Sequence, residues 1–229
     1  MTVIDSFVQI FDKVSTHETK DTWVVDEADT GASFKHLKIQ NTDNIFYVIE
    51  NSVYKHWKVI TECKSNLLKD LDCDGVAITM FDHTPVFLLC ELKTALDTKK
   101  IFHAMEQIIF SYIKLYMLFS LCKDLDSENY SLVGIISCKP PKNESQETFL
   151  KSQLCIQQQK RDGDLSSISL YTARLFYEHK LDIEIGKIPF LKDKLLSNKI
   201  RKKKITIFLK TAKSYEQDSA IFNIKEEFT

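Results

Sequence analysis

The 229-residue sequence contains only five glycines, and none of them belongs to a Gly-x-x-x-x-Gly-Lys motif. That motif cradles the phosphates of a nucleotide, so P-loop nucleotide hydrolysis is not expected. The six cysteines include no Cys-x-x-Cys pair, and the six histidines include no His-x-x-x-His pair. The sequence therefore predicts no zinc site of a common spacing and no thioredoxin-like redox motif.

A long uninterrupted apolar run is also missing. The longest apolar segment, residues 101–122, contains His103, Glu106 and Lys114, which indicates a buried helix rather than a membrane span. The N-terminus does not show the basic and then apolar pattern of a secretory signal. Several cysteines lie inside apolar runs, where a thiol behaves as a small hydrophobic group. We therefore expect a cytoplasmic protein with no membrane partner.

The charge of the chain is balanced overall but uneven along the sequence. The formal net charge is -1, yet residues 199–204 carry five positive charges and residues 21–29 contain four acidic residues and no basic one. The basic run could follow a phosphate backbone or could form a solvated face. The net charge therefore neither supports nor excludes a nucleic-acid partner.

The order of the apolar patterns predicts an α/β protein. A helix is expected at 98–121, because Asp97 can cap it and neither proline nor glycine interrupts it. Its aromatic side chains are expected to lie in the core. An amphipathic helix is predicted at 3–14, strands at 38–40, 45–49, 130–138, 167–171 and 205–209, and a turn at 41–44, while 53–71 fits either a helix or a strand.

Two further apolar runs, 74–81 and 85–93, are separated by a turn-like segment and predict a hairpin with both faces covered by helices. A two- or four-residue loop would place Asp74, Glu91 and Lys93 on one face, because side chains alternate along a strand. The expected register puts Asp74 opposite Lys93, and Leu92 points to the other face. Whether the three side chains share one face therefore depends on whether the loop has an even or an odd number of residues.

Two carboxylates and a lysine on one rim suit metal-assisted cleavage of a phosphodiester. Magnesium prefers carboxylate and carbonyl oxygens, so Asp74, Glu91 and the Leu92 carbonyl are the predicted ligands, with manganese as the alternative ion. Lys93 is expected to orient or help deprotonate the attacking water and to stabilise the charged transition state.

These residues resemble a known signature. Asp74-Gly75, followed after sixteen residues by Glu91-Leu92-Lys93, is similar to the catalytic motif of the PD-(D/E)xK nuclease superfamily. Gln107 and Tyr112 are similar to the glutamine and tyrosine that follow this motif in several branches, although the tyrosine usually comes four residues after the glutamine, where this chain has Ser111. The chain also has no proline before Asp74. No residue is assigned to the helical glutamate of some members, for which Glu50 and Glu62 are the candidates.

The resemblance implies a central mixed β-sheet flanked by helices, with a restriction-endonuclease-like core at about 35–140 and a C-terminal extension at about 141–229 within a single domain, 1–229. It implies a magnesium-dependent endonuclease that cleaves DNA, with RNA as the alternative substrate. Host defence or foreign-DNA processing is the setting that analogy alone suggests. Asp74 and Glu91 would hold the metal, and Lys93 would orient or help deprotonate the attacking water. Gln107 would help position these residues.

Other interpretations stay open. Glu-x-Lys also occurs at 18–20, 62–64 and 178–180, so the tripeptide alone is not specific and the residues could be a solvated strand end. The main rival is a catalytically inactive protein of the same fold that acts as a binding or partner subunit. A homodimer, another protein partner and an unrelated α/β protein with a chance match also remain possible.

Overall fold

The computed structural model describes residues 16–55, 71–121, 130–159, 165–191 and 196–228. The strands are β1 (Thr16–Asp26), β2 (His36–Ile49), β3 (Gly75–Phe81), β4 (Thr84–Lys93), β5 (Ser131–Cys138), β6 (Lys180–Glu184), β7 (Lys204–Thr211) and β8 (Ser219–Asn223). The helices are α2 (Asn51–Tyr54), α4 (Thr98–Phe119), α5 (Glu144–Gln159), α6 (Leu165–Glu178), α7 (Asn198–Lys202) and α8 (Ile224–Phe228), with short 3-10 turns η1 (Ile185–Lys187) and η2 (Pro189–Leu191). The helix predicted at 3–14 and most of the ambiguous segment 53–71 lie outside the described residues.

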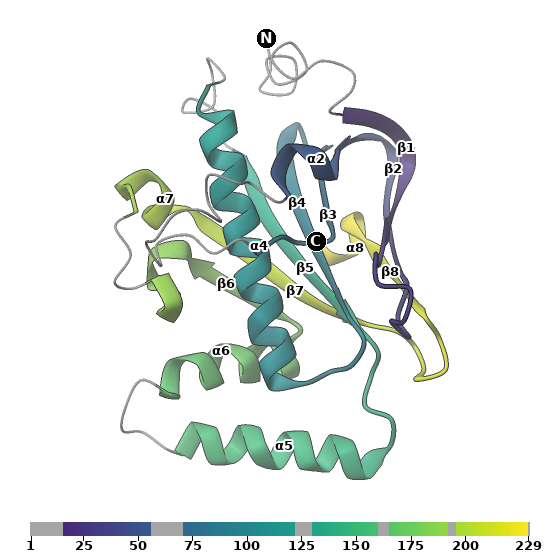
Figure 1. The fold of residues 1–229 in the computed structure, drawn as a ribbon, viewed down its shortest axis with the longest axis vertical. Helices are drawn as coiled ribbons and strands as arrows, with labels where there is room; N and C mark the ends of the chain where they lie inside the picture. Colours follow the sequence, from purple (N-terminus) through teal and green to yellow (C-terminus); the bar gives the residue numbers. More distant parts are fainter. Residues whose placement is uncertain (1–15, 56–70, 122–129, 160–164, 192–195, 229) are drawn as a thin grey trace.

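One mixed sheet of eight strands organises the described chain (Figure 1). The strands run in the order β1-β2-β3-β4-β5-β7-β6, and β8 also pairs with β2. From β1 to β4, each strand is antiparallel to the next. Strands β4, β5 and β7 are parallel, β6 is antiparallel to β7, and β8 is parallel to β2. The predicted α/β class with a central mixed sheet and flanking helices is confirmed. Strands β7 and β8, from the part predicted as a C-terminal extension, lie within this same sheet.

The predicted hairpin forms from β3 and β4, but with a different register. Phe81 pairs with Thr84, so only Asp82 and His83 form the loop. Both have positive φ, 47° and 60°, as a type I′ turn requires, and Asp and His are among the residues that tolerate this conformation. Gly75 pairs with Cys90, so the expected pairing of Asp74 with Lys93 is wrong by two residues. A register shift of two residues leaves each side chain on the same face of the sheet, so the predicted face of each strand is unchanged.

The turn predicted at 41–44 is wrong, because β2 continues through it. The chain instead contains an irregularity in the β1–β2 pairing, where the register shifts between Lys20 and Thr22. Asp21 and Asp43 have positive φ there, and the Asp43 amide donates to Asp21 Oδ1 at 2.7 Å. A bulge of this kind absorbs turn-forming residues without ending a strand. The first half of β2 pairs with β8 and the second half with β3.

Helix α4 is the long helix expected from sequence. The Asp97 side chain accepts hydrogen bonds from the Lys99 and Lys100 amides, which caps its first turn. Phe110, Tyr112 and Phe119 are buried, as predicted for the aromatic residues of this helix. None of the helices in the described segments is long and apolar enough to cross a membrane.

The C-terminal half contains one wrong assignment. Residues 167–171 were predicted as a strand but belong to helix α6, because the alternation of Ile168 and Leu170 is embedded in a longer helical spacing that includes Leu165, Ile168, Thr172 and Leu175. The polar segment after residue 142 forms α5. The predicted strands at 130–138 and 205–209 are confirmed as β5 and β7.

The core has two parts, one on each face of the sheet. One contains Val76, Phe87 and Leu89 together with the buried face of α4. The other contains Ala77, Leu88 and Leu92 and is completed by side chains of β1, β2, β8 and α8, so on this side the only helical part of the cover among the described residues is the five-residue α8. Gly75 reflects the close packing: a Cβ there would lie 2.8 Å from Val25 Cγ1 and 2.9 Å from Trp23 Cζ2. Glycine therefore lets β3 begin directly beneath β1.

Candidate active site

The four residues singled out from sequence converge at one end of the β3–β4 hairpin. Lys93 Nζ forms an ion pair with Glu91 Oε1 and donates a hydrogen bond to Gln107 Oε1 at 2.7 Å. Glu91 and Lys93 belong to β4, and Gln107 belongs to the helix that covers this face of the strand. A strand end and a helix face therefore fix the lysine between a carboxylate and an amide.

Asp74 completes the group from the other strand of the hairpin. Because Gly75 pairs with Cys90, the preceding residue, Asp74, faces Glu91. Asp74 Oδ2 accepts a hydrogen bond from the Leu92 amide at 2.7 Å. The N–H and C=O of a strand residue point to the same side, so the Leu92 carbonyl also points toward the Asp74 side of β4. Asp74 and Glu91 therefore lie on one rim, and this carbonyl is expected to face it.

Glu91 carries the most unusual environment in the site. Its side chain is 2% exposed, and its second carboxylate oxygen, Oε2, is buried without a hydrogen-bond partner. Burial, with a further contribution from the Asp74 charge, raises the pKa of Glu91 to about 8, while Lys93 opposes the shift. Burial likewise raises the pKa of Asp74 to about 6, against the effect of the Leu92 amide. Lys93 pairs with Glu91 Oε1, so one lysine faces two largely buried carboxylates.

Helix α4 also clamps the segment that carries Asp74. Gln107 Nε2 donates to the Asp72 carbonyl at 2.8 Å, the Cys73 amide donates to Ser111 Oγ at 2.8 Å, and Lys114 Nζ forms a buried ion pair with Asp72. Positions 107, 111 and 114 lie on one face of a helix. One helix face therefore holds both Lys93 and the approach to Asp74.

The tyrosine of the resemblance does not take part in this clamp. The Tyr112 hydroxyl lies 2.9 Å from the Tyr130 hydroxyl, and the side chain is buried. Ser111, at the position four residues after Gln107, contacts the Cys73 amide instead. The two positions thus have separate roles, one in the core and one in the clamp.

Two hollows border the site. One, of about 440 Å³, is lined by Leu92, Lys93 and Glu27 among others, and the other, of about 270 Å³, is lined by Asp74 and Glu50 among others. Glu27, at the end of β1, was not predicted from sequence, and its charge contributes to the raised pKa values of both Asp74 and Glu91. The acidic character of residues 21–29 was the only sequence feature that pointed to Glu27. Glu62 lies outside the described residues.

The residues fit an ion that keeps part of its water shell. Within the described segments, no group of three or more His, Cys, Asp or Glu side chains could hold a metal ion by itself. Asp74, Glu91 and the Leu92 carbonyl offer oxygen ligands only, which is the set that magnesium takes when it retains several waters. The partnerless Glu91 Oε2 is the atom that most needs a cation.

Comparisons of the chain with models of known protein families, with curated proteins and with solved structures find no match.

The raised pKa of Glu91 predicts a pH-dependent stability. Between the ordinary carboxyl value of 4.5 and about 8, the folded state binds more protons than the unfolded state, so the free energy of unfolding falls as the pH rises. The Glu91→Gln variant, which is neutral at every pH, should exceed the wild type by about 2–4 kcal/mol at pH 8 and differ little at pH 5. Urea denaturation with a chelator present would measure this difference. A variant that is less stable at pH 8 would show instead that the Glu91–Lys93 pair stabilises the fold.

Proposed function

We propose that the protein is a metal-dependent nuclease that hydrolyses phosphodiester bonds of DNA, with RNA as the alternative substrate. The observation that carries this proposal is the buried, partnerless Glu91 Oε2, which lies on one rim with Asp74 and beside a lysine that Gln107 holds in place. Uncompensated buried carboxylates destabilise a fold unless a bound cation offsets them. Such an arrangement is typical of functional sites.

Each residue has a distinct part in the proposed chemistry. Asp74 and Glu91 would hold magnesium or manganese, which when bound polarises the phosphoryl group and lowers the pKa of a water ligand. Lys93 orients the attacking water and stabilises negative charge that develops on the phosphoryl oxygens. Gln107 accepts a hydrogen bond from Lys93 and donates one to the Asp72 carbonyl, so it positions the lysine relative to Asp74.

The proposed setting is cytoplasmic. Cys73, Cys90 and Cys138 are free and buried, which suits a reducing environment. Host defence or foreign-DNA processing is an extension by analogy with the resembling nucleases. This extension concerns the biological role of the protein and not the proposed reaction at Asp74, Glu91 and Lys93.

A cleavage assay tests the proposal directly. Linear, circular and single-stranded DNA and RNA are incubated with the protein in magnesium, in manganese and in a chelator. The wild type should cut at least one of them in a metal-dependent manner, and Asp74→Asn should lose at least about 100-fold of the rate, as expected when a metal ligand is removed. Asp43→Asn is the matched control, because Asp43 is an exposed residue of the β1–β2 bulge.

Two results would reject the proposal. One is the absence of cleavage of every substrate in both metals. The other is an Asp74→Asn variant that cleaves as fast as Asp43→Asn, since the activity would then come from another site or a contaminant.

A specific observation favours the rival, a partner subunit without catalysis. Glu91 Oε1 is already paired with Lys93, and Asp74 already accepts the Leu92 amide, so part of each carboxylate is satisfied within the fold. A partner subunit would show no rise in melting temperature when magnesium is added. A nuclease that binds the ion in its folded state would show a rise that grows with the magnesium concentration.

A further inference from the structure

The carboxyl ends of three parallel strands lie side by side at the edge that carries the candidate site. Lys93 of β4 pairs with Cys138 of β5, and Cys138 pairs with Thr211 of β7. Neighbouring strands are about 4.8 Å apart, so Thr211 lies about 10 Å from Lys93 along this edge. The residues that follow β5 and β7 therefore emerge next to the Glu91–Lys93 pair.

Lys139, the first residue after β5, has an unusual environment. It is 8% exposed, and its Nζ lies 5.0 Å from the centre of the Tyr215 ring. Lys142 Nζ lies 5.9 Å from the centre of the same ring. Neither lysine forms an ion pair with a carboxylate of the described residues. An aromatic ring offsets only part of the cost of the buried Lys139 ammonium, whereas the exposed Lys142 adds a solvated charge beside the same ring.

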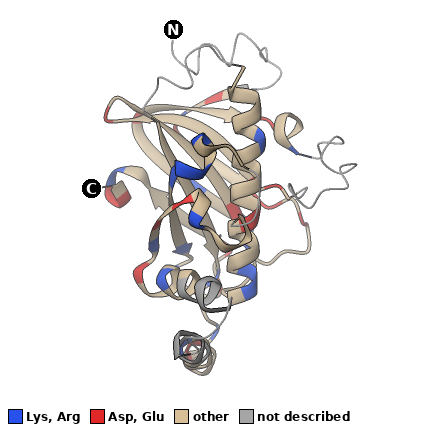
Figure 2. Cartoon of the chain, turned by 90° about the vertical axis from the view of Figure 1, so that its left-hand side faces the viewer, with Lys and Arg blue, Asp and Glu red and all other residues tan. Residues whose placement is uncertain are grey.

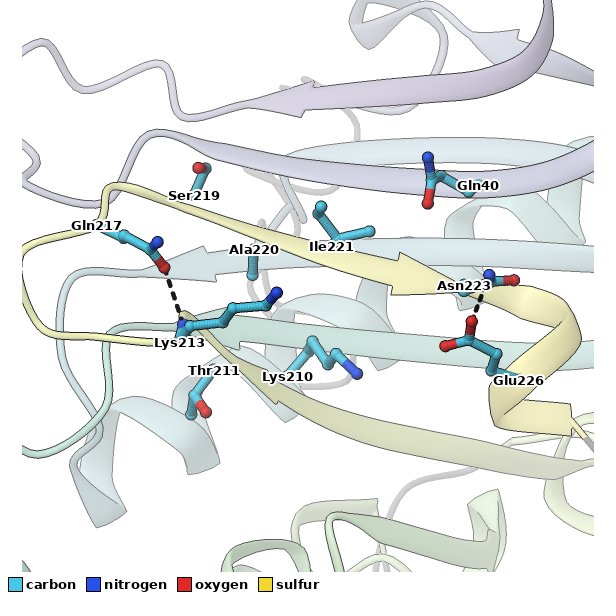
Figure 3. A pocket seen from close by; sticks show the side chains of 10 residues that line it. All are labelled: Gln40, Lys210, Thr211, Lys213, Gln217, Ser219, Ala220, Ile221, Asn223 and Glu226. Carbon is cyan, nitrogen blue, oxygen red and sulfur yellow. Dashed lines mark hydrogen bonds between the residues drawn. The ribbon is translucent and has the colours of Figure 1, made fainter.

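A third lysine extends the cluster away from the site. Lys213 lies two residues after the end of β7, and its side chain runs over a hollow of about 380 Å³ between β7 and β8 (Figure 3). The hollow is lined mainly by polar side chains, including Gln40, Thr211 and Ser219. Ammonium, amide and hydroxyl groups are the donors that proteins use to bind phosphate oxygens. Glu216 and Asp218 in the same turn are exposed and pair with none of these lysines among the described contacts.

We propose that Lys139 and Lys142, which lie against Tyr215, form together with Lys213 a phosphate-binding rim that holds the backbone of the nucleic-acid substrate beside the bond to be cleaved. This inference rests on the proposed function and adds residues that the nuclease motif does not contain. Lys139 directly follows Cys138, which pairs with Lys93, so a nucleic-acid strand bound at this end of the rim lies close to the candidate site. Tyr215 offers the remaining face of its ring to a base or sugar.

The basic run at 199–204, considered from sequence as a phosphate contact, lies elsewhere. It forms α7 and the first residue of β7, and eight strand residues separate that end of β7 from the rim by about 23 Å. Basic and acidic residues are interspersed on the side that carries α6 and α7, with no continuous stripe of one sign among the described residues (Figure 2). The exposed Lys202 and Lys204 therefore provide a matched control for the rim lysines.

Binding in the absence of divalent metal tests the rim without cleavage. Fluorescence anisotropy of a labelled 20-nucleotide DNA, single-stranded and duplex, gives the dissociation constant over a range of KCl concentrations. The double variant Lys142→Gln/Lys213→Gln should weaken binding about tenfold at 0.1 M KCl and reduce the slope of log K against log[KCl] by about 1.5. Lys202→Gln/Lys204→Gln, with the same change in charge, should alter the affinity less than about twofold.

The outcomes separate the rim from the nuclease proposal. Equal effects of the two double variants, or no binding of either DNA by the wild type, would overturn the rim. Rim-dependent binding without cleavage in magnesium or manganese would support the rim and count against the nuclease proposal. If Lys142→Gln/Lys213→Gln still cleaves DNA and binds it with unchanged affinity, the nuclease proposal stands and the rim proposal is rejected. All four lysines are exposed, and a thermal melt of each variant confirms that it folds.

Discussion

Replacing Lys93 by alanine is expected to lower the rate of metal-dependent cleavage by about 10²–10³-fold while the protein still binds the metal. Lys93 is the only one of the four site residues that brings positive charge, and it lies between Glu91 and Gln107. Removal of one preorganised group that stabilises transition-state charge typically costs this much in rate. Single-turnover cleavage measures the rate, and the magnesium-dependent shift in melting temperature reports metal binding separately.

Two further variants give this experiment its controls. Lys99→Ala removes an exposed lysine from the hollow that Lys93 lines, and it should change the rate by less than about fivefold, because its charge is solvated. Lys93→Arg keeps the charge but cannot release a proton at neutral pH. Partial activity in Lys93→Arg would mean that charge is the main contribution, and no activity would mean that proton transfer or exact geometry matters. Similar rates for Lys93→Ala and the wild type would remove Lys93 from the mechanism.

The candidate site could be predicted because its key relations are local. Asp74, Glu91 and Lys93 belong to one hairpin, and strand alternation decides their faces once the loop is short. The expected register was wrong because the loop holds two residues, Asp82 and His83, instead of four. An even shift moves a residue along the strand without moving it to the other face, so the convergence survived the error.

Relations between distant segments could not be predicted in the same way. Glu27 reaches the site because β1 folds over the start of β3, where Gly75 leaves room for Trp23 and Val25. Lys139 and Tyr215 meet because β5 and β7 are neighbours in the sheet. No local sequence pattern encodes the order of the strands in the sheet. The pairing of β8 with β2 is part of that same long-range order.

The same applies to the buried pair of Lys114 and Asp72, whose positions in the sequence are 42 residues apart. From sequence, Lys114 indicated only that the apolar segment 101–122 is not a membrane span. In the fold its side chain is 0% exposed and the Asp72 side chain is 9% exposed. The pair links the middle of α4 to the residues immediately before Asp74, so it connects the stability of the core with the geometry of the site.

Lys114→Met is therefore expected to lower the free energy of unfolding by about 3–5 kcal/mol, because it removes the buried ammonium that pairs with the Asp72 carboxylate. The double variant Asp72→Asn/Lys114→Met removes both charges and should recover part of that loss, while Lys99→Met on the exposed face of the same helix should cost less than about 0.5 kcal/mol. Urea denaturation measures all three. A cost below about 1 kcal/mol for Lys114→Met would mean that water replaces the lysine at Asp72. If the double variant regains stability but cleaves slowly, the ion pair serves to position Asp74 more than to hold the fold together.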